Sequence, residues 1–409
     1  MYRPTHRGKA ADGRLYNIRI TSALQTGHSY TLASPALASP VSSPRASVVP
    51  IVEYLPALTG LRFGLAIWVI LHHICGTGMM LEAWARSLPA PLPALIAGGY
   101  LAVQTFFVLS GFVLARTYAH ARWNRQSLGR FFTARFARIY PVYFVSLIVI
   151  SPFVIEMLTS PSWKGIGRGS LLANYIFVLQ GWTGALGVGW NTPAWSLSCE
   201  FFFYLCFPAL FVMLRHARWA TIAVAMALSI LTPIALDHAG VPWNWKPLYN
   251  LPDFVAGIAA ARIFALTTGS RRWLNRGYWL YVPALIVGGL LIVYRATFDG
   301  GWADLNTYLR PVNVALLVGF ALSGGWIARW LSTSLADFLG RSSYSMYVLH
   351  VPILWWYGRY YVHSKLQPAR PMAAAIYLMI VIATAGLVFQ WLESPASVWI
   401  RARQKRATR

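Results

Sequence analysis

Residues 58–77 read LTGLRFGLAIWVILHHICGT. A helix of about 20 apolar residues is long enough to cross a bilayer, yet this run carries Arg62 and His73. Their positions are eleven apart, about 16 Å at the helical rise and close to three turns, so both side chains lie on nearly the same face. Because an ionisable group costs roughly 2.5 kcal/mol or more at mid-bilayer, such groups usually mark a site. We interpret the stretch as one wall of a buried reaction chamber; a snorkelling Arg62 and a packed His73 are the alternative.

The composition is that of a membrane protein. Hydrophobic residues make up 57% of the 409 residues and charged residues only 11%, whereas soluble domains carry about 25% charged residues. The net charge of +24 would also suit a nucleic-acid-binding protein. The excess Lys and Arg, however, fall mainly between apolar runs, as cytoplasmic loops do under the positive-inside rule. We therefore expect a lipid bilayer and no nucleic acid as partner.

Hydrophobic runs predict an all-α, polytopic integral membrane protein with about ten transmembrane helices in one bundle. The predicted spans are 58–78, 95–116, 139–158, 195–214, 219–236, 250–266, 279–294, 311–328, 343–357 and 373–391. A further apolar patch at 171–190 is broken by glycines, which weaken a helix, so we expect a re-entrant or interfacial element there.

Charge and composition divide the chain into three parts. Residues 1–50 contain no apolar run and are predicted to be a disordered, basic cytoplasmic tail. Residues 51–400 form the membrane domain, and residues 401–409 form a basic C-terminal tail. With ten spans and the N-terminus inside, most Lys and Arg fall on the cytoplasmic side, so both termini are predicted to be cytoplasmic.

Two arginines precede the third predicted span. Arg135 and Arg138 are three positions apart and therefore share one helix face. Two guanidinium groups on one face suit a bidentate phosphate site. Ordinary topogenic charge is the alternative.

A rare carboxylate enters the fourth span. Glu200 is one of only eleven acidic residues and follows Trp195, Ser196 and Ser198. A carboxylate beside apolar residues is costly unless it is paired, and His73 is predicted to reach the same half of the membrane. The alternative is a hydrated Glu200 in the first helical turn, where the helix dipole favours acids.

The ninth span carries a polar stripe. Tyr344, Tyr347 and His350 are each three positions apart and should face protein or a cavity and not lipid. The sequence shows no Walker loop, no GxGxxG motif and no clear metal-ligand cluster, so we expect no metal.

Six stretches together resemble the membrane-bound acyltransferase-3 family, the bacterial O-acyltransferases that modify cell-envelope glycans. They are LTGLRFGLAIWVILHH (58–73), FFVLSGFVL (106–114), RFARIYPVYF (135–144), NTPAWSLSCEFFFYLCFP (191–208), LGRSSYSMYVLHVPI (339–353) and WLESP (391–395). They occur in the order that the family has. One departure is Gln104-Thr105, where many members carry an acid.

The resemblance implies an O-acyltransferase that uses acetyl-CoA or another acyl-CoA from the cytoplasm. It implies Arg135, Arg138 and Arg62 as donor-binding residues. It also implies His73 as general base or acyl carrier, with Glu200 and Arg62 in the catalytic set. For the acceptor we select polar and aromatic residues within two of these stretches, namely Asn191, Trp195, Ser196, Tyr344 and His350.

The expected acceptor is a carbohydrate hydroxyl on exopolysaccharide, O-antigen, peptidoglycan, a lipid-linked sugar or an antibiotic sugar. The expected location is the bacterial cytoplasmic (inner) membrane. A transporter or flippase for a glycan or lipid-linked intermediate is the competing class, since it also needs many spans with buried polar groups. It predicts internal repeats, and the chain shows no convincing repeat.

Overall fold

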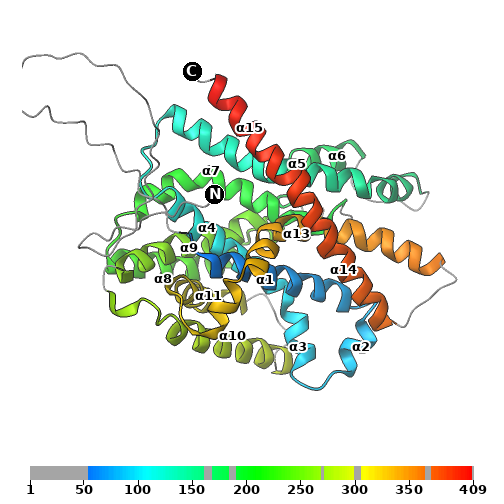
Figure 1. Ribbon diagram of the computed structural model, residues 1–409, viewed down its shortest axis with the longest axis horizontal. Helices are drawn as coiled ribbons and strands as arrows, with labels where there is room; N and C mark the ends of the chain where they lie inside the picture. Colours follow the sequence, from blue (N-terminus) through cyan, green and yellow to red (C-terminus); the bar gives the residue numbers. More distant parts are fainter. Residues whose placement is uncertain are drawn as a thin grey trace, which may run out of the picture. The chain divides into compact units, whose positions relative to one another are not determined.

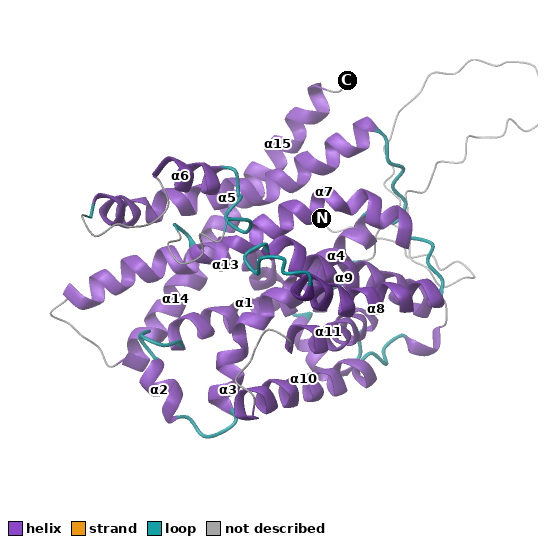
Figure 2. Cartoon of the chain, turned by 180° about the vertical axis from the view of Figure 1, so that it is seen from behind, coloured by secondary structure: helices purple, strands orange, loops and turns teal. Residues whose placement is uncertain are grey.

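The computed structural model describes residues 54–160, 168–183, 190–268, 271–298, 305–363 and 370–407. Every regular element within these ranges is a helix, which confirms the predicted all-α class (Figure 2). The predicted N-terminal tail, residues 1–50, lies outside the described residues, as do the last two residues of the predicted C-terminal tail.

Figure 1 labels most of the α-helices along the chain. In chain order, the described helices are α1 (Pro56–Cys75), α2 (Glu82–Ser87), α3 (Leu92–Ala97), η1 (Gly98–Leu101), α4 (Ala102–Thr117), α5 (Arg125–Thr159), α6 (Arg168–Ile176), η3 (Thr192–Ala194), α7 (Trp195–Leu214), α8 (Trp219–His238), α9 (Lys246–Thr268), η4 (Arg271–Trp273), α10 (Tyr278–Phe298), α11 (Leu305–Leu322), α12 (Gly325–Leu331), α13 (Ser334–His363), α14 (Arg370–Val388), η5 (Phe389–Glu393) and α15 (Ser394–Ala407).

The long helices account for the ten predicted spans. Nine segments of the described chain are long and apolar enough to cross a membrane. The remaining predicted span, 343–357, lies inside α13, which is 30 residues long. One span is shifted at both ends, because α11 begins and ends six residues before the predicted 311–328. Its end is set by Ser323 and Gly324, whose φ angles of 62° and 94° are left-handed and stop a right-handed helix.

The glycine-broken patch at 171–190 does not form a spanning helix in its described part. Within it the structure has α6, nine residues long, followed by turns up to residue 183. Nine residues rise only about 14 Å, less than half of the hydrocarbon core. Residues 184–189 of the patch lie outside the described residues.

Surface side chains on the long helices are apolar over much of their length. Met213, Leu205 and Leu290 are 73%, 68% and 63% exposed. A water-soluble protein rarely exposes so much contiguous apolar surface, whereas lipid tails solvate it at no cost. The bundle therefore presents a bilayer-facing exterior.

Glycines bring α1 and α13 into backbone contact. A Cβ atom added at Gly340 of α13 would lie 1.9 Å from the carbonyl oxygen of Thr59 in α1. No side chain fits in that space, so only glycine allows the two helices to approach this closely. The contact matters because α1 carries Arg62 and His73 and α13 carries the polar stripe.

The polar stripe of α13 is buried, as predicted. Tyr344 and Tyr347 are each 8% exposed, and His350 is fully buried. A second buried polar group was not predicted: Arg310 of α11 and Asp253 of α9 form an ion pair of 2.8 Å, at 1% and 0% exposure.

Candidate active site

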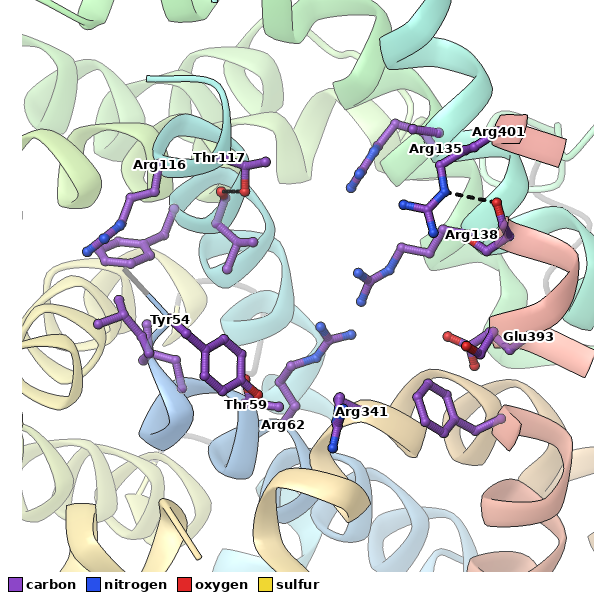
Figure 3. A pocket seen from close by; sticks show the side chains of 18 residues that line it. Tyr54, Thr59, Arg62, Arg116, Thr117, Arg135, Arg138, Arg341, Glu393 and Arg401 are labelled. Carbon is purple, nitrogen blue, oxygen red and sulfur yellow. Dashed lines mark hydrogen bonds between the residues drawn. The ribbon is translucent and has the colours of Figure 1, made fainter. Parts of the chain in front are cut away.

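Three cavities contain most of the residues that the sequence motifs predict. The first, which we call the arginine pocket, has a volume of about 410 Å³. Six arginines from five helices line it, together with a single carboxylate, Glu393 (Figure 3). These arginines are Arg62, Arg116, Arg135, Arg138, Arg341 and Arg401. Arg341 is paired with Asp337 at 2.7 Å. Six guanidinium groups against Glu393 and Asp337 leave an excess of four positive charges, which suits a multiply charged anion.

The predicted arginine pair lies on one wall of this pocket. Helix α5 begins at a capping box, in which the Asn124 side chain accepts a hydrogen bond of 2.8 Å from the Ser127 amide. Ten residues further on, the helix presents Arg135 and Arg138 to the cavity, where Figure 3 shows both side chains. The Nε atoms of Arg62 and Arg135 are buried and have no hydrogen-bond partner among the described residues. The pocket therefore holds guanidinium donors that are available to a ligand.

Glu393 is a pocket residue that the residue-by-residue prediction missed. It lies on η5, one turn of π-helix between α14 and α15, and it is 6% exposed. A π-turn inserts an extra residue into the helix and is frequent at functional sites. Here it points the carboxylate into the arginine pocket, where it accepts a hydrogen bond of 2.6 Å from Ser345. The signal in the sequence was an acid directly after the last apolar span, in the WLESP stretch.

The second cavity, which we call the central cavity, is small, about 50 Å³. Arg62 lines it as well as the arginine pocket, so the two cavities meet at this side chain. The other polar lining residues are Ser196, Glu200, Ser343, Tyr344 and Tyr347. The stripe of α13 therefore forms one side of a polar path that leads away from the arginine pocket.

The third cavity, which we call the His73 pocket, has a volume of about 1130 Å³. His73 lies on its wall with aromatic and charged residues such as Trp355, Tyr361, Glu82 and Arg370. The pocket is therefore large enough for a bulky acceptor and offers rings on which a sugar can stack.

The hydrogen bond of His73 defines its tautomer. Its Nδ1 lies 2.9 Å from the carbonyl oxygen of Val69. A carbonyl oxygen only accepts, so Nδ1 carries the hydrogen and Nε2 of the neutral ring carries the lone pair. His73 is thus held in the form that takes a proton at Nε2.

Glu200 is not in contact with His73. Its Oε2 accepts a hydrogen bond of 2.5 Å from Tyr204, and it lines the central cavity with Arg62. No hydrogen bond or ion pair joins Glu200 to His73 in the described chain. The aromatic neighbours of His73 are instead His350 and His72, with ring centroids 5.0 Å and 5.4 Å away.

The residues selected for acceptor binding fall into separate places. Asn191 is fully buried and donates hydrogen bonds of 3.0 Å to Ser146 Oγ and to the Val348 carbonyl, outside the three cavities. Trp195 packs edge-on against Phe107. Ser196 and Tyr344 line the central cavity.

The fold and the site together define a polytopic membrane protein with a cationic pocket and a histidine-lined pocket at the two ends of one helix. The family model described as an acyltransferase domain, Acyl_transf_3, matches residues 55–389. The chain therefore belongs to the acyltransferase-3 family and is an acyltransferase of groups other than aminoacyl groups.

Two named relatives are similar over most of the chain. Acyltransferase MdmB of Streptomyces mycarofaciens is 29% identical over 389 residues, which cover 88% of this chain and 96% of MdmB. O-acetyltransferase OatA of Staphylococcus aureus is 23% identical over 84% of this chain, but the match covers only 57% of OatA. No solved structure matches the chain.

Proposed function

We propose that this protein transfers an acyl group, with acetyl as the first candidate, from cytoplasmic acyl-CoA to a hydroxyl group of an extracytoplasmic or lipid-linked carbohydrate. One observation carries the proposal. Arg62 and His73 lie on the same helix, and one lines the arginine pocket while the other lines the His73 pocket. A donor held at the first site and an acceptor held at the second would meet inside the bundle.

The arginine pocket supports a donor with several phosphates. Guanidinium groups bind phosphate oxygens bidentately and stay charged at any physiological pH. Coenzyme A carries a diphosphate and a 3′-phosphate on its nucleotide, and its thioester sits at the end of a long, thin pantetheine arm. We propose that Arg135, Arg138 and Arg62 bind the phosphates and that the arm enters the central cavity.

The tautomer of His73 supports general-base catalysis. The lone pair at Nε2 would take the proton of the acceptor hydroxyl as its oxygen attacks the thioester carbonyl. Glu200, beside Arg62 in the central cavity, would orient that arginine. In the second possible route His73 attacks the thioester itself and carries the acyl group. Labelled protein after incubation with [14C]acetyl-CoA, in the absence of acceptor, would identify that route.

The name O-acetyltransferase of the relative OatA supports a hydroxyl group as the acceptor. The aromatic residues that line the His73 pocket, such as Trp355 and Tyr361, suit a sugar ring as the carrier of that hydroxyl. Exopolysaccharide, O-antigen, peptidoglycan, a lipid-linked sugar and an antibiotic sugar remain the candidate acceptors. We place the protein in the bacterial cytoplasmic membrane with both termini in the cytoplasm, because that orientation leaves most Lys and Arg inside.

The decisive variant is His73→Ala. The measurement is the transfer of label from [14C]acetyl-CoA to envelope glycan in inside-out vesicles of a deletion strain that carries the variant. We expect transfer to fall below detection while the tagged protein keeps its elution volume on size-exclusion chromatography in detergent. Wild-type transfer by His73→Ala would refute the proposed role of His73.

A further inference from the structure

One buried hydroxyl group on the wall of the central cavity lacks a partner. Ser343 of α13 is 1% exposed and lines this cavity. Its Oγ has no hydrogen-bond partner among the described residues. A buried polar atom without a partner is rare in native proteins and calls for an explanation. Because Ser343 borders a cavity, a ligand in that cavity can provide the missing partner.

The neighbouring serines of the same helix do have partners. The Ser342 hydroxyl donates a hydrogen bond of 3.0 Å to the carbonyl oxygen of Leu339. The Ser345 hydroxyl donates one of 2.6 Å to Glu393. A serine inside a helix can thus satisfy its hydroxyl on the preceding turn, as Ser342 does. Ser343 differs from both neighbours, because it lines the central cavity.

Arg62 brings a second donor without a partner to the same cavity. Its Nε is buried and unbonded within the part of the chain that the structure describes. The tyrosine hydroxyls of the cavity are already bonded to backbone carbonyls, Tyr344 to Ile139 at 2.6 Å and Tyr347 to Pro193 at 2.9 Å. The groups that remain for a ligand are therefore a hydroxyl and a guanidinium N–H, and both can donate to an oxygen.

The size of the central cavity restricts what can occupy it. Its volume is about 50 Å³, against about 410 Å³ for the arginine pocket, so it admits a thin chain and excludes a nucleotide. The pantetheine arm of coenzyme A is a thin chain with two amide groups, whose carbonyl oxygens accept hydrogen bonds. An aliphatic chain in the same place would leave the buried donors without partners, which is unfavourable.

The position of Ser343 along the bundle matches the position of the amides along the arm. Gly340 contacts Thr59 near the start of α1, and His350 contacts His73 near its end, so α1 and α13 run in the same direction. Ser343 therefore lies on the side of the arginine pocket and before the level of His73. In coenzyme A the amides likewise lie between the phosphates and the sulfur.

We propose that Ser343 is a donor-binding residue, whose hydroxyl donates a hydrogen bond to an amide carbonyl of the pantetheine arm. The inference rests on the proposed function, because it assumes an acyl-CoA donor. It divides donor recognition into two parts: the arginines bind the phosphates, and Ser343 binds the arm.

Two ligands separate these parts. Coenzyme A has both the phosphates and the arm, whereas adenosine 3′-phosphate 5′-diphosphate has the phosphates alone. Free coenzyme A also lacks the acyl group, so its binding reports on the arm and not on the thioester carbonyl. The measurement is the Kd of each ligand for the purified full chain in detergent, by isothermal titration calorimetry. A neutral hydrogen bond is worth about 3-fold to 10-fold in an equilibrium. We expect Ser343→Ala to raise the Kd of coenzyme A by about that factor and to leave the Kd of the nucleotide unchanged.

Ser342 provides the matched control. It is fully buried on the same helix, but its hydroxyl is bonded within the helix and it does not line the central cavity. Ser342→Ala should therefore keep both Kd values within about twofold. Arg135→Ala should weaken both ligands, because both carry the phosphates.

Three results would overturn the role of Ser343: an unchanged Kd of coenzyme A in Ser343→Ala, an equal rise for both ligands in that variant, or an equal rise in Ser342→Ala. Failure of the proposed function would look different. In that case the wild-type chain would bind neither ligand, which would refute the acyl-CoA donor and the role of Ser343 with it.

Discussion

Ser345 of α13 donates a hydrogen bond of 2.6 Å to Glu393 on the π-turn η5. The bond ties the last span to α13 at the wall of the arginine pocket. It also orients the only carboxylate among the residues that line this pocket. Glu393 therefore contributes a negative charge to the pocket and also accepts the hydrogen bond from Ser345. A substitution that keeps the hydrogen bond and removes the charge should separate these two effects on donor binding and catalysis.

The first prediction concerns the charge of Glu393. Glu393→Gln keeps an acceptor for Ser345 but removes the negative charge that faces Arg62 and Arg138. The pocket becomes more positive, so the KM for acetyl-CoA should stay the same or fall. The arginines lose the counter-charge that lines the pocket with them, so kcat should fall about tenfold, which corresponds to about 1.4 kcal/mol of electrostatic energy. Steady-state kinetics in vesicles decides the matter; a raised KM with wild-type kcat would contradict the prediction.

The second prediction concerns the arginine pair of α5. Arg135→Ala or Arg138→Ala should raise the KM for acetyl-CoA by about 10-fold to 100-fold, the value of a charged hydrogen bond. Lysine at either position should recover only part of the loss, because it cannot bind a phosphate bidentately. Arg130 is the matched control, since it lies on the same helix, is exposed and does not line the pocket.

A truncated donor sharpens this second test. Acetyl-pantetheine has the thioester but no phosphate, so the arginine variants should use it as well as the wild type does. Equal losses with acetyl-CoA and acetyl-pantetheine would show that the arginines support the fold and not the phosphates.

Much of this site was predictable from local spacing. The spacing of eleven positions from Arg62 to His73 requires the two side chains to lie far apart on one helix, and the structure places them at two different cavities. The stripe of Tyr344, Tyr347 and His350 was predicted to be buried, because a polar face in an apolar helix is too costly in lipid.

Contacts between distant helices were less predictable. Glu200 was expected to reach His73, but the rotation of α7 about its axis depends on packing and not on its own sequence. In the structure, this rotation of α7 directs the Glu200 carboxylate to the central cavity. Asp253 and Arg310 are 57 residues apart, and no periodic pattern connects them. The π-turn at Glu393 was missed because a single inserted residue leaves the hydrophobic period almost unchanged.

The third prediction concerns the contact between α1 and α13. In Gly340→Ala the added methyl group would lie 1.9 Å from the Thr59 carbonyl oxygen, so the two helices must separate. Forcing a methyl group into a packed interface costs about 1–3 kcal/mol. The detergent-solubilised variant should therefore lose its monodisperse size-exclusion peak at a lower temperature than the wild type. Because α1 carries Arg62 and His73 while α13 carries Ser343, we also expect kcat to fall about tenfold or more, as for small misplacements of reacting groups.

Gly64 on α1 makes the third test specific. A Cβ atom at Gly64 would meet no atom within 4 Å, so Gly64→Ala introduces the same methyl group without a clash. Alanine favours a helix over glycine by about 0.5–1 kcal/mol, so this variant should be at least as stable as the wild type and fully active. If Gly340→Ala were equally stable and active, the close approach of the α1 and α13 backbones would not be needed to position Arg62 and His73.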